Sequence, residues 1–214
     1  MYDSVRDLFP SFSKEFEGRV PFMYLDIRGL VTVGVGNLID PVSQALELPF
    51  VHEGKGDAAS RAEIEAEWQM LKSQLQLAHQ GHQACESITR LRLTEAAIDE
   101  LIIARLHSNE VLLRKRFIEW DSWPADAQLG VLSMAWALGP GFPSKWPKFT
   151  AAIKTKDFDG AAAHCRMHEA DNLGVKPRND ADQLLFTNAA AVERQNLDRA
   201  ELHYRKPMPS NVES

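Results

Sequence analysis

The sequence predicts an α+β protein that is mainly helical, with a β-hairpin near the N-terminus and a buried helix at its centre. Two short β-like runs, at residues 22–26 and 31–35, flank a turn at Arg28 and Gly29. Elsewhere, apolar residues recur at helical spacing. Residues 127–138 are apolar almost all round, which is typical of a buried central helix.

The composition is that of an ordinary globular protein. The chain has 214 residues, of which 44% are hydrophobic and 25% charged, and its net charge is −6. Mild acidity argues against broad binding to nucleic acid or to anionic membranes. No apolar run approaches the ~20 residues of a membrane helix, and the N-terminus lacks the pattern of a signal peptide. We expect a monomer with neither a nucleic-acid partner nor a membrane partner.

We predict a single domain over residues 1–214. Residues 1–90 would form the smaller lobe, which contains the hairpin at 22–35 and an insertion. Residues 91–206 would form the helical lobe. Residues 207–214 would be a frayed tail.

Near the N-terminus, apolar residues recur at helical spacing: Val5, Leu8, Phe9, Phe12 and Phe16. Gly18 is typical of a helix stop. The sequence therefore predicts that Glu17 closes this helix, beside its apolar face.

Two further helices have recognisable starts. Ser60 and Glu63 form a capping box that opens a helix over residues 61–77. Thr94 caps a second long helix that runs to the basic residues at 114–116. The remaining helices are expected at residues 127–138, 147–154, 158–168 and 179–204.

The candidate site begins with the faces of the hairpin. Side chains alternate along a strand, so Tyr24 shares a face with Asp26, and Thr32 shares one with Gly34 and Gly36. If the register brings Asp26 near Thr32, a carboxylate and a hydroxyl meet on a face that glycines keep bare. Such a face lets a ligand approach the backbone closely.

Glu17 and Asp26 have the makings of an acid and base pair. A carboxyl group beside apolar side chains favours the protonated form, and a carboxyl group on a polar strand face favours the ionised form. Taken singly, each of these residues would ordinarily be a solvated surface group.

The spacing of these residues resembles a known signature. Eight residues separate Glu17 from Asp26, five separate Asp26 from Thr32, and the run from Thr32 to Leu38 reads Thr-Val-Gly-Val-Gly-Asn-Leu. This pattern closely resembles the catalytic signature of phage-type lysozymes, glycoside hydrolase family 24. The resemblance implies a lysozyme-like fold, with a small lobe that holds the β-hairpin, a larger helical lobe, and a cleft between the lobes. The chain could be a phage endolysin or the lysozyme-like domain of a secreted antibacterial effector, and its acidic charge and enlarged middle segment slightly favour the effector.

The resemblance implies a role for each residue. Glu17 would act as the general acid, while Asp26, helped by the Thr32 hydroxyl, would position and deprotonate a water. The family resemblance also implies inversion at the reacting carbon, for which the two carboxyl groups should stand about 6.5–9.5 Å apart.

Weaker matches extend the resemblance. Trp136 falls where the family's central helix places an aromatic residue in the cleft, and Arg178 falls where an arginine pairs with the catalytic glutamate. Gly36 and Leu38 match substrate-contacting positions, and Tyr24 is a further candidate for substrate binding. Asn37 stands where the family often has histidine, whose role is mainly structural.

The function implied is that of a muramidase, a glycosidase that hydrolyses the β-1,4 bond between N-acetylmuramic acid and N-acetylglucosamine in peptidoglycan. Two alternatives stay open. A lytic transglycosylase would need only a single acid, and a lysozyme scaffold could serve as a non-catalytic peptidoglycan-binding module. The presence of Glu17, Asp26 and Thr32 at family spacing speaks against both.

The partner implied is the glycan strand of peptidoglycan in the cell wall, reached in the periplasm. Because the N-terminus lacks a signal pattern, delivery would use either a phage pore, as for an endolysin, or a secretion system, as for a toxin effector. An effector would also meet an immunity protein.

Two groups of residues have the spacing of metal ligands: His79, His82 and Cys85; His164, Cys165 and His168. Neither group contains the Glu of a zinc peptidase signature. We expect neither a metal site nor a cofactor. The two cysteines are far apart in the sequence and are expected to be free, buried thiols, although one disulfide stays open.

Overall fold

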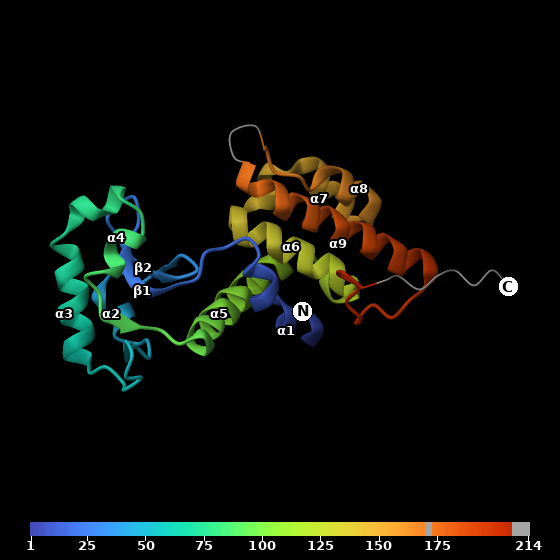
Figure 1. Cartoon of the computed structure of the whole chain (residues 1–214). Coiled ribbons are helices and arrows are strands. Elements are labelled where there is room, and N and C mark those ends of the chain that lie inside the picture. Colours follow the sequence, from blue (N-terminus) through green and yellow to red (C-terminus); the bar gives the residue numbers. More distant parts are fainter. Residues whose placement is uncertain (170–172, 207–214) are drawn as a thin grey trace. The chain divides into compact units, whose positions relative to one another are not determined.

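The computed structural model describes residues 1–169 and 173–206, apart from the Leu173 side chain (Figure 1). The predicted tail at 207–214 lies outside the described residues. The chain divides into two compact units. Residues 17–102 form one, here called the hairpin unit, and residues 1–16 together with those from 103 onward form the other, the helical unit.

This division differs from the predicted one. The boundary falls after residue 102 instead of residue 90, and the first 16 residues group with the C-terminal part of the chain. The reason is the packing of helix α1 (Asp3–Ser13) against helix α6 (Ala125–Leu138). The rings of Phe9 and Trp136 lie 5.2 Å apart, centre to centre, in this contact.

The hairpin unit is built on a three-stranded antiparallel sheet in the order β1 (Val20–Leu25), β2 (Val31–Gly34) and β3 (Asn37–Leu38). The predicted hairpin is therefore confirmed, with one strand more than expected. A register irregularity between Val20 and Tyr24 interrupts the β1–β2 pairing.

The rest of the hairpin unit consists of short elements around the sheet: α2 (Val42–Ala45), β4 (Val51–His52), α3 (Arg61–Lys72), the 3₁₀ helix η1 (Leu75–His79), α4 (Gln83–Glu86) and β5 (Leu91–Arg92). Strands β4 and β5 pair with each other. The capping box that opens α3 is confirmed, because the Ser60 side chain accepts from the Glu63 amide while the Glu63 side chain accepts from the Ser60 amide.

Helix α5 (Glu95–Arg114) contains the boundary between the units. The Thr94 hydroxyl accepts from the Ala97 amide at 3.1 Å, which confirms the predicted cap. The helical unit continues with η2 (Trp120–Ser122), α6, η3 (Phe142–Lys145), α7 (Pro147–Lys154), α8 (Phe158–His164), η4 (Leu173–Val175) and α9 (Lys176–Gln195).

The core of the helical unit lies along α6, which packs against α9 (Figure 1). Residues 125–136 of α6 are all buried, as their apolar pattern predicts. Gly130 of α6 lies against α9, and an added Cβ there would lie 2.7 Å from the ring of Phe186. Only glycine fits this crossing without a shift of the ring.

Several helices end earlier than predicted. α1 stops at Ser13, so Glu17 does not close it. Beyond Ser13 the backbone tightens into three-residue turns, in which the Glu15 amide donates to the Phe12 carbonyl and the Phe16 amide to the Ser13 carbonyl. α3 stops at Lys72 in place of residue 77, and the chain tightens there in the same way, with the Gln74 amide donating to the Leu71 carbonyl.

The last two helices also differ from prediction. α8 ends at His164, and beyond it the Met167 amide and carbonyl bond to the Asn179 side chain, each at 2.8 Å. α9 spans Lys176–Gln195 in place of 179–204. Its end is set by Asn196, which adopts a left-handed conformation with φ 51°. The mainly helical α+β class is confirmed.

Candidate active site

The strand register aligns three of the predicted site residues. Tyr24 on β1 pairs with Thr32 on β2, and Thr32 pairs with Leu38 on β3. Directly opposed residues of antiparallel strands share one face, so the three side chains form a row across the sheet. Thr32 is buried, Tyr24 is half-buried, and Leu38 is 46% exposed. The row is therefore open to solvent at its Leu38 end.

Asp26 holds the turn that joins β1 to β2. Its Oδ1 accepts from the backbone amides of Arg28 at 2.8 Å and Leu30 at 2.9 Å. The Asp26 amide donates to the Leu30 carbonyl, and Gly29 completes the turn with φ 74°. Within the part of the chain that the structure describes, Oδ2 is paired with the Arg28 Nε, at 3.5 Å. One carboxylate oxygen is thus fixed by the backbone, and the other lies beside an exposed guanidinium group.

The Thr32 hydroxyl has a different partner from the one considered above. It donates to the Leu30 carbonyl at 3.2 Å, so it is not bonded to the Asp26 carboxylate. The two side chains are linked instead through Leu30, whose amide binds Asp26 and whose carbonyl accepts from Thr32.

Glu17 lies in the connection between α1 and β1, where it is half-buried. The pKa of the Tyr24 hydroxyl is raised, first by burial and then by the negative charges of Asp26 and Glu17. Both carboxyl groups therefore lie within electrostatic reach of one phenol, although eight residues separate them in the sequence. Tyr24 is thus a neighbour that the predicted acid and base share within the hairpin unit.

Two glycines, Gly34 and Gly36, allow the backbone to turn between β2 and β3. Gly34 and Gly36 have φ of 68° and 79°, which side-chain-bearing residues rarely adopt. The Asn37 side chain accepts from the Val35 amide at 3.3 Å, so this side chain supports the turn. An added Cβ at Gly34 would lie 3.2 Å from the Asn37 Oδ1.

Two residues that the sequence analysis missed, Lys72 and Asp40, support the turn that carries Asp26. The Lys72 ammonium donates to the Gly29 carbonyl at 2.9 Å and to the Asp40 Oδ2 at 2.8 Å. Asp40 also accepts from the Val31 amide at 3.2 Å. No sequence motif predicts this arrangement. The one signal available was the position of Lys72, a charged residue at the end of a helix whose apolar residues form a stripe.

A second unpredicted group lies beside Tyr24. The ring of His82, on the turn that opens α4, lies 5.9 Å from the Tyr24 ring and 6.3 Å from the Phe22 ring, centre to centre. The Arg92 guanidinium stands over Phe22 at 5.0 Å. His82 therefore packs as an aromatic neighbour of the sheet.

Trp136 lies on α6 inside the helical unit and is 3% exposed. It packs against Phe9, and the Arg105 guanidinium stands 4.2 Å from the centre of its ring. These are the contacts of a core residue, and its contact with substrate stays a prediction.

Arg178 lies in the first turn of α9 and is buried. Its Nη1 lies 3.4 Å from both the hydroxyl and the carbonyl oxygen of Ser133. Its guanidinium stands 4.8 Å from the ring centre of Phe16, the residue that precedes Glu17 in the chain. The pairing of Arg178 with Glu17 stays a prediction.

A buried carboxyl group, which the sequence analysis missed, lies one helical turn beyond Arg178. Asp182 is completely buried, and burial raises its pKa to about 7, while the Ser133 hydroxyl and the Arg178 charge oppose this rise. The signal available in the sequence was the spacing of an Arg and an Asp four residues apart on one helix face.

The histidine and cysteine groups do not converge. Within the described residues, no cluster of three or more His, Cys, Asp and Glu side chains has the arrangement of a metal site. Cys85 and Cys165 are free and buried, as predicted. Burial, followed by the charge of Asp182, raises the pKa of the Cys165 thiol to about 12, so this thiol stays protonated.

None of the helices in the described part of the chain has both the length and the apolar character needed to cross a bilayer.

A scan against protein-family models finds no match to this chain, and a search of curated proteins likewise finds none.

Proposed function

We propose that this chain is a peptidoglycan muramidase that hydrolyses the β-1,4 bond between N-acetylmuramic acid and N-acetylglucosamine. The proposal rests on the resemblance of residues 17–38 to the signature of phage-type lysozymes. The presence of a small antiparallel sheet in one unit and of mainly helical structure in the other is also consistent with the fold that this resemblance implies.

The observation that supports this proposal best is the electrostatic link of two carboxyl groups to Tyr24. Asp26 and Glu17 both raise the pKa of its hydroxyl, within a single compact unit. A glycosidase that uses an acid and a base needs two carboxyl groups on opposite sides of the scissile bond. A half-buried phenol beside both of them supplies a surface for a sugar ring and a hydroxyl that can donate to it.

In the proposed reaction, the protonated Glu17 carboxyl transfers its proton to the glycosidic oxygen as the bond from that oxygen to the anomeric carbon breaks. A water held by the Asp26 Oδ2 attacks the anomeric carbon and gives its proton to Asp26. The negative charge of Asp26 also stabilises the oxocarbenium-like transition state. The products are a new reducing end and a free hydroxyl.

One observation favours a second candidate, a lytic transglycosylase. The Asp26 Oδ1 is fully engaged in the turn through the Arg28 and Leu30 amides, as a purely structural aspartate would be. Glu17 would then be the single catalytic carboxyl. In that reaction the muramic acid C6 hydroxyl, instead of water, attacks the anomeric carbon, which gives an anhydro product.

The deciding experiment is digestion of purified peptidoglycan by the wild type, Glu17→Gln and Asp26→Asn, with the released fragments identified by mass spectrometry. A muramidase gives reducing-end muropeptides, and each substitution should lower the rate by a factor of about 100 or more. Anhydro products from both the wild type and Asp26→Asn would establish the transglycosylase. Cut peptides, or no products, would overturn both candidates.

Matched controls are available close to both residues. Glu15→Gln removes an exposed carboxylate two residues before Glu17. The Glu15 carboxylate is paired with Arg205 at 2.8 Å. Asp57→Asn removes an exposed carboxylate of the hairpin unit. Both variants should keep the rate of the wild type, because neither residue belongs to the proposed site.

We further propose that the substrate is met in the cell wall, after delivery by a secretion system or through a phage pore. The neighbouring genes test this: genes for secretion components and an immunity protein would indicate an effector, and a gene for a holin would indicate an endolysin.

A further inference from the structure

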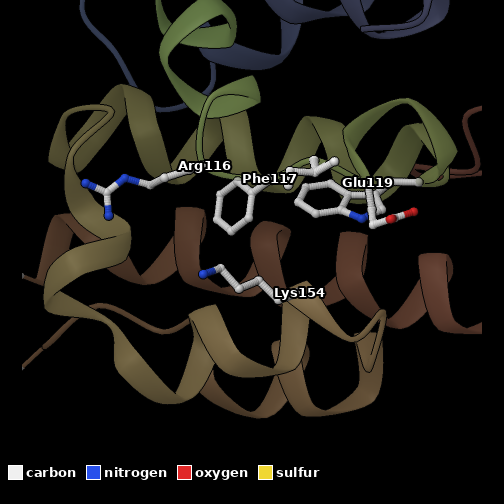
Figure 2. A pocket seen from close by; sticks show the side chains of 6 residues that line it. Arg116, Phe117, Glu119 and Lys154 are labelled. Atoms are coloured by element: carbon white, nitrogen blue, oxygen red, sulfur yellow. The ribbon is translucent and has the colours of Figure 1, made fainter.

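The helical unit has a pocket of about 290 Å³ between the turn that follows α5 and the end of α7 (Figure 2). The aromatic rings in its floor are not accessible to a ligand, because Phe117 is 2% exposed and Trp123 is completely buried. The hairpin unit has the opposite arrangement. There, two neighbouring rings, those of Tyr24 and His82, carry polar atoms that a ligand can reach.

His82 is an exposed residue on the turn that opens α4, and its ring is held against the sheet. The ring centre lies 5.9 Å from that of Tyr24, with an angle of 64° between the two ring planes, and 6.3 Å from that of Phe22. Phe22 is 3% exposed, so it gives the imidazole a fixed support. The Cys85 amide donates to the His82 carbonyl at 2.9 Å, which anchors the backbone of this turn.

The polar atoms of both rings are available to a ligand. Among the residues that the structure describes, neither the Tyr24 hydroxyl nor the ring nitrogens of His82 have a hydrogen-bond partner. The Tyr24 hydroxyl is not among the buried side-chain atoms that lack a partner, so it reaches solvent. Polar groups that packing already holds in place can bind a ligand at a small cost in conformational entropy.

The two rings lie beside the groups of the proposed reaction. The charges of Asp26 and Glu17 both raise the pKa of the Tyr24 hydroxyl, so both carboxyl groups act on the ring that His82 contacts. All four residues belong to the hairpin unit. A sugar residue bound to the Tyr24 hydroxyl would therefore lie close to the acid and the base, with His82 as its next neighbour.

We propose that Tyr24 and His82 form a subsite for an uncharged N-acetylated sugar residue, to which the phenol hydroxyl and an imidazole nitrogen each hydrogen-bond. The proposal rests on the muramidase function, because it assumes a glycan substrate. Sugar hydroxyl groups both donate and accept, as does the tyrosine hydroxyl, and an imidazole nitrogen can take either role. The negative charge of Asp26 disfavours a muramoyl residue here, since that sugar carries an acidic side group. The subsite therefore favours N-acetylglucosamine.

The first test titrates N,N′,N″-triacetylchitotriose, an uncharged trimer of N-acetylglucosamine, into the full chain. NMR of the backbone amide signals follows binding, and we expect saturable shifts in β1 and at the start of α4. Methyl N-acetyl-β-glucosaminide should shift the same signals, whereas N-acetylmuramic acid should leave those of α4 unshifted. No saturable shift with the trimer would overturn the subsite, and equal shifts with both monosaccharides would overturn its preference for an uncharged sugar.

Substitutions then test the hydrogen bonds. His82→Phe keeps a ring beside Tyr24 but removes the nitrogens, and it should weaken binding of the trimer by about fivefold. Tyr24→Phe removes only the hydroxyl and should have an effect of similar size. His82→Gln restores a polar group without a ring and should bind the trimer more tightly than His82→Phe does. The reverse order, or an affinity of His82→Phe equal to that of the wild type, would overturn the assigned hydrogen bond.

His79→Phe is the matched control. His79 is an exposed histidine of η1, and within the described residues its ring has no contact with an aromatic ring of the sheet. This variant should bind the trimer as the wild type does. A loss of affinity as large as that of His82→Phe would mean that any exposed histidine in this region has the same effect, and the subsite would be rejected.

Peptidoglycan turnover separates this inference from the muramidase proposal on which it rests. We expect His82→Phe to raise KM by about fivefold with little change in kcat, because a contact made equally in the ground state and the transition state affects binding alone. If the wild type cuts peptidoglycan while His82→Phe changes neither KM nor trimer binding, the inference about His82 fails alone. If the wild type binds the trimer through His82 but cuts no glycosidic bond, the subsite stands and the muramidase proposal fails.

Discussion

Tyr24 and Thr32 stand directly opposite each other in the β1–β2 pair, with Leu38 next in the same row across β3. This register fixes which groups the proposed site can use. Tyr24 lies within the reach of both carboxyl groups. The Thr32 hydroxyl is tied to the Leu30 carbonyl, and so to the turn that Asp26 holds. The proposed site is therefore built into the hairpin turn, whose geometry and chemistry can be tested separately.

The first prediction separates the two roles of Asp26. Asn at position 26 keeps an oxygen that can accept from the Arg28 and Leu30 amides but cannot take a proton from water. We expect Asp26→Asn to change the free energy of unfolding by less than about 0.5 kcal/mol while activity falls by about 100-fold or more. Urea unfolding and peptidoglycan turnover measure the two effects.

Asp26→Ala is the companion variant, because alanine loses the turn bonds as well as the base. It should lower the free energy of unfolding by about 1–2 kcal/mol in addition to abolishing activity. If Asp26→Asn retains activity and only Asp26→Ala loses it, Asp26 is a turn residue and not the base.

The second prediction concerns the Tyr24 hydroxyl. Its pKa is raised by burial and by the charges of Asp26 and Glu17, in that order of size. Negative charges disfavour the phenolate, so removing either charge should lower this pKa toward its ordinary value, and Asp26→Asn should lower it more than Glu17→Gln does. NMR titration of ¹³C-labelled tyrosine measures the shift in each variant.

Tyr204 is the internal control for this titration. Its pKa is also raised, first by burial and then by the charge of Glu15, so neither substitution in the hairpin unit should move it. A Tyr24 pKa that is the same in the wild type and in Glu17→Gln would remove the observation on which the muramidase proposal mainly rests.

The features of the fold that the sequence predicted correctly are those that depend on neighbouring residues, such as helix caps and the hairpin turn. The Ser60 capping box, the Thr94 cap and the hairpin around Gly29 all follow from residues within a few positions of one another. Even so, the prediction of the end of α1 was wrong, because the backbone tightens into three-residue turns after Ser13 although the apolar periodicity continues to Phe16.

What could not be read were the contacts between distant residues. Lys72 reaches the carbonyl of Gly29 and the carboxylate of Asp40, 43 and 32 residues away in the sequence. Arg178 contacts Ser133, which is 45 residues away. Such partners are chosen by how helices and strands pack, so neither periodicity nor composition identifies them.

The third prediction tests the contact of α6 with α9 at Gly130. A Cβ at Gly130 would lie 2.7 Å from the ring of Phe186, which is completely buried. Alanine favours a helix over glycine by about 1 kcal/mol, but overpacking costs about 1–3 kcal/mol. We expect Gly130→Ala to destabilise the protein, with a lower urea midpoint.

Gly141→Ala is the matched control, because a Cβ there meets no atom within 4 Å and its φ of −81° suits alanine. Its urea midpoint should stay close to that of the wild type. A Gly130→Ala variant as stable as Gly141→Ala would mean that α6 and α9 do not cross as closely as described.

The fourth prediction concerns Asp182, whose pKa burial raises to about 7. In the unfolded chain this carboxyl group ionises at its ordinary value, near pH 4, whereas in the folded protein it stays neutral until about pH 7. The unfolded state therefore binds fewer protons between these values, and stability falls as the pH rises through this window. From pH 5 to pH 7, the wild type should lose about 2–3 kcal/mol relative to Asp182→Asn.

Urea unfolding at pH 5, 7 and 8 measures the free energy of unfolding of the wild type and of Asp182→Asn. The test uses the change of their difference with pH, so it does not depend on the absolute stability of either protein. Asp180→Asn is the matched control on the same helix. Asp180 pairs with Lys176 and Arg166, which lower its pKa. The stability that these ion pairs contribute is therefore fully present above the pKa of Asp180 in the unfolded chain and is lost only in acid. The free energies of unfolding of the wild type and of Asp180→Asn should therefore differ by a constant amount from pH 5 to pH 8.

A constant difference in the free energy of unfolding between the wild type and Asp182→Asn over the same range would show that Asp182 is ionised in the folded protein. The Arg178 charge would then outweigh the cost of burying the Asp182 carboxylate.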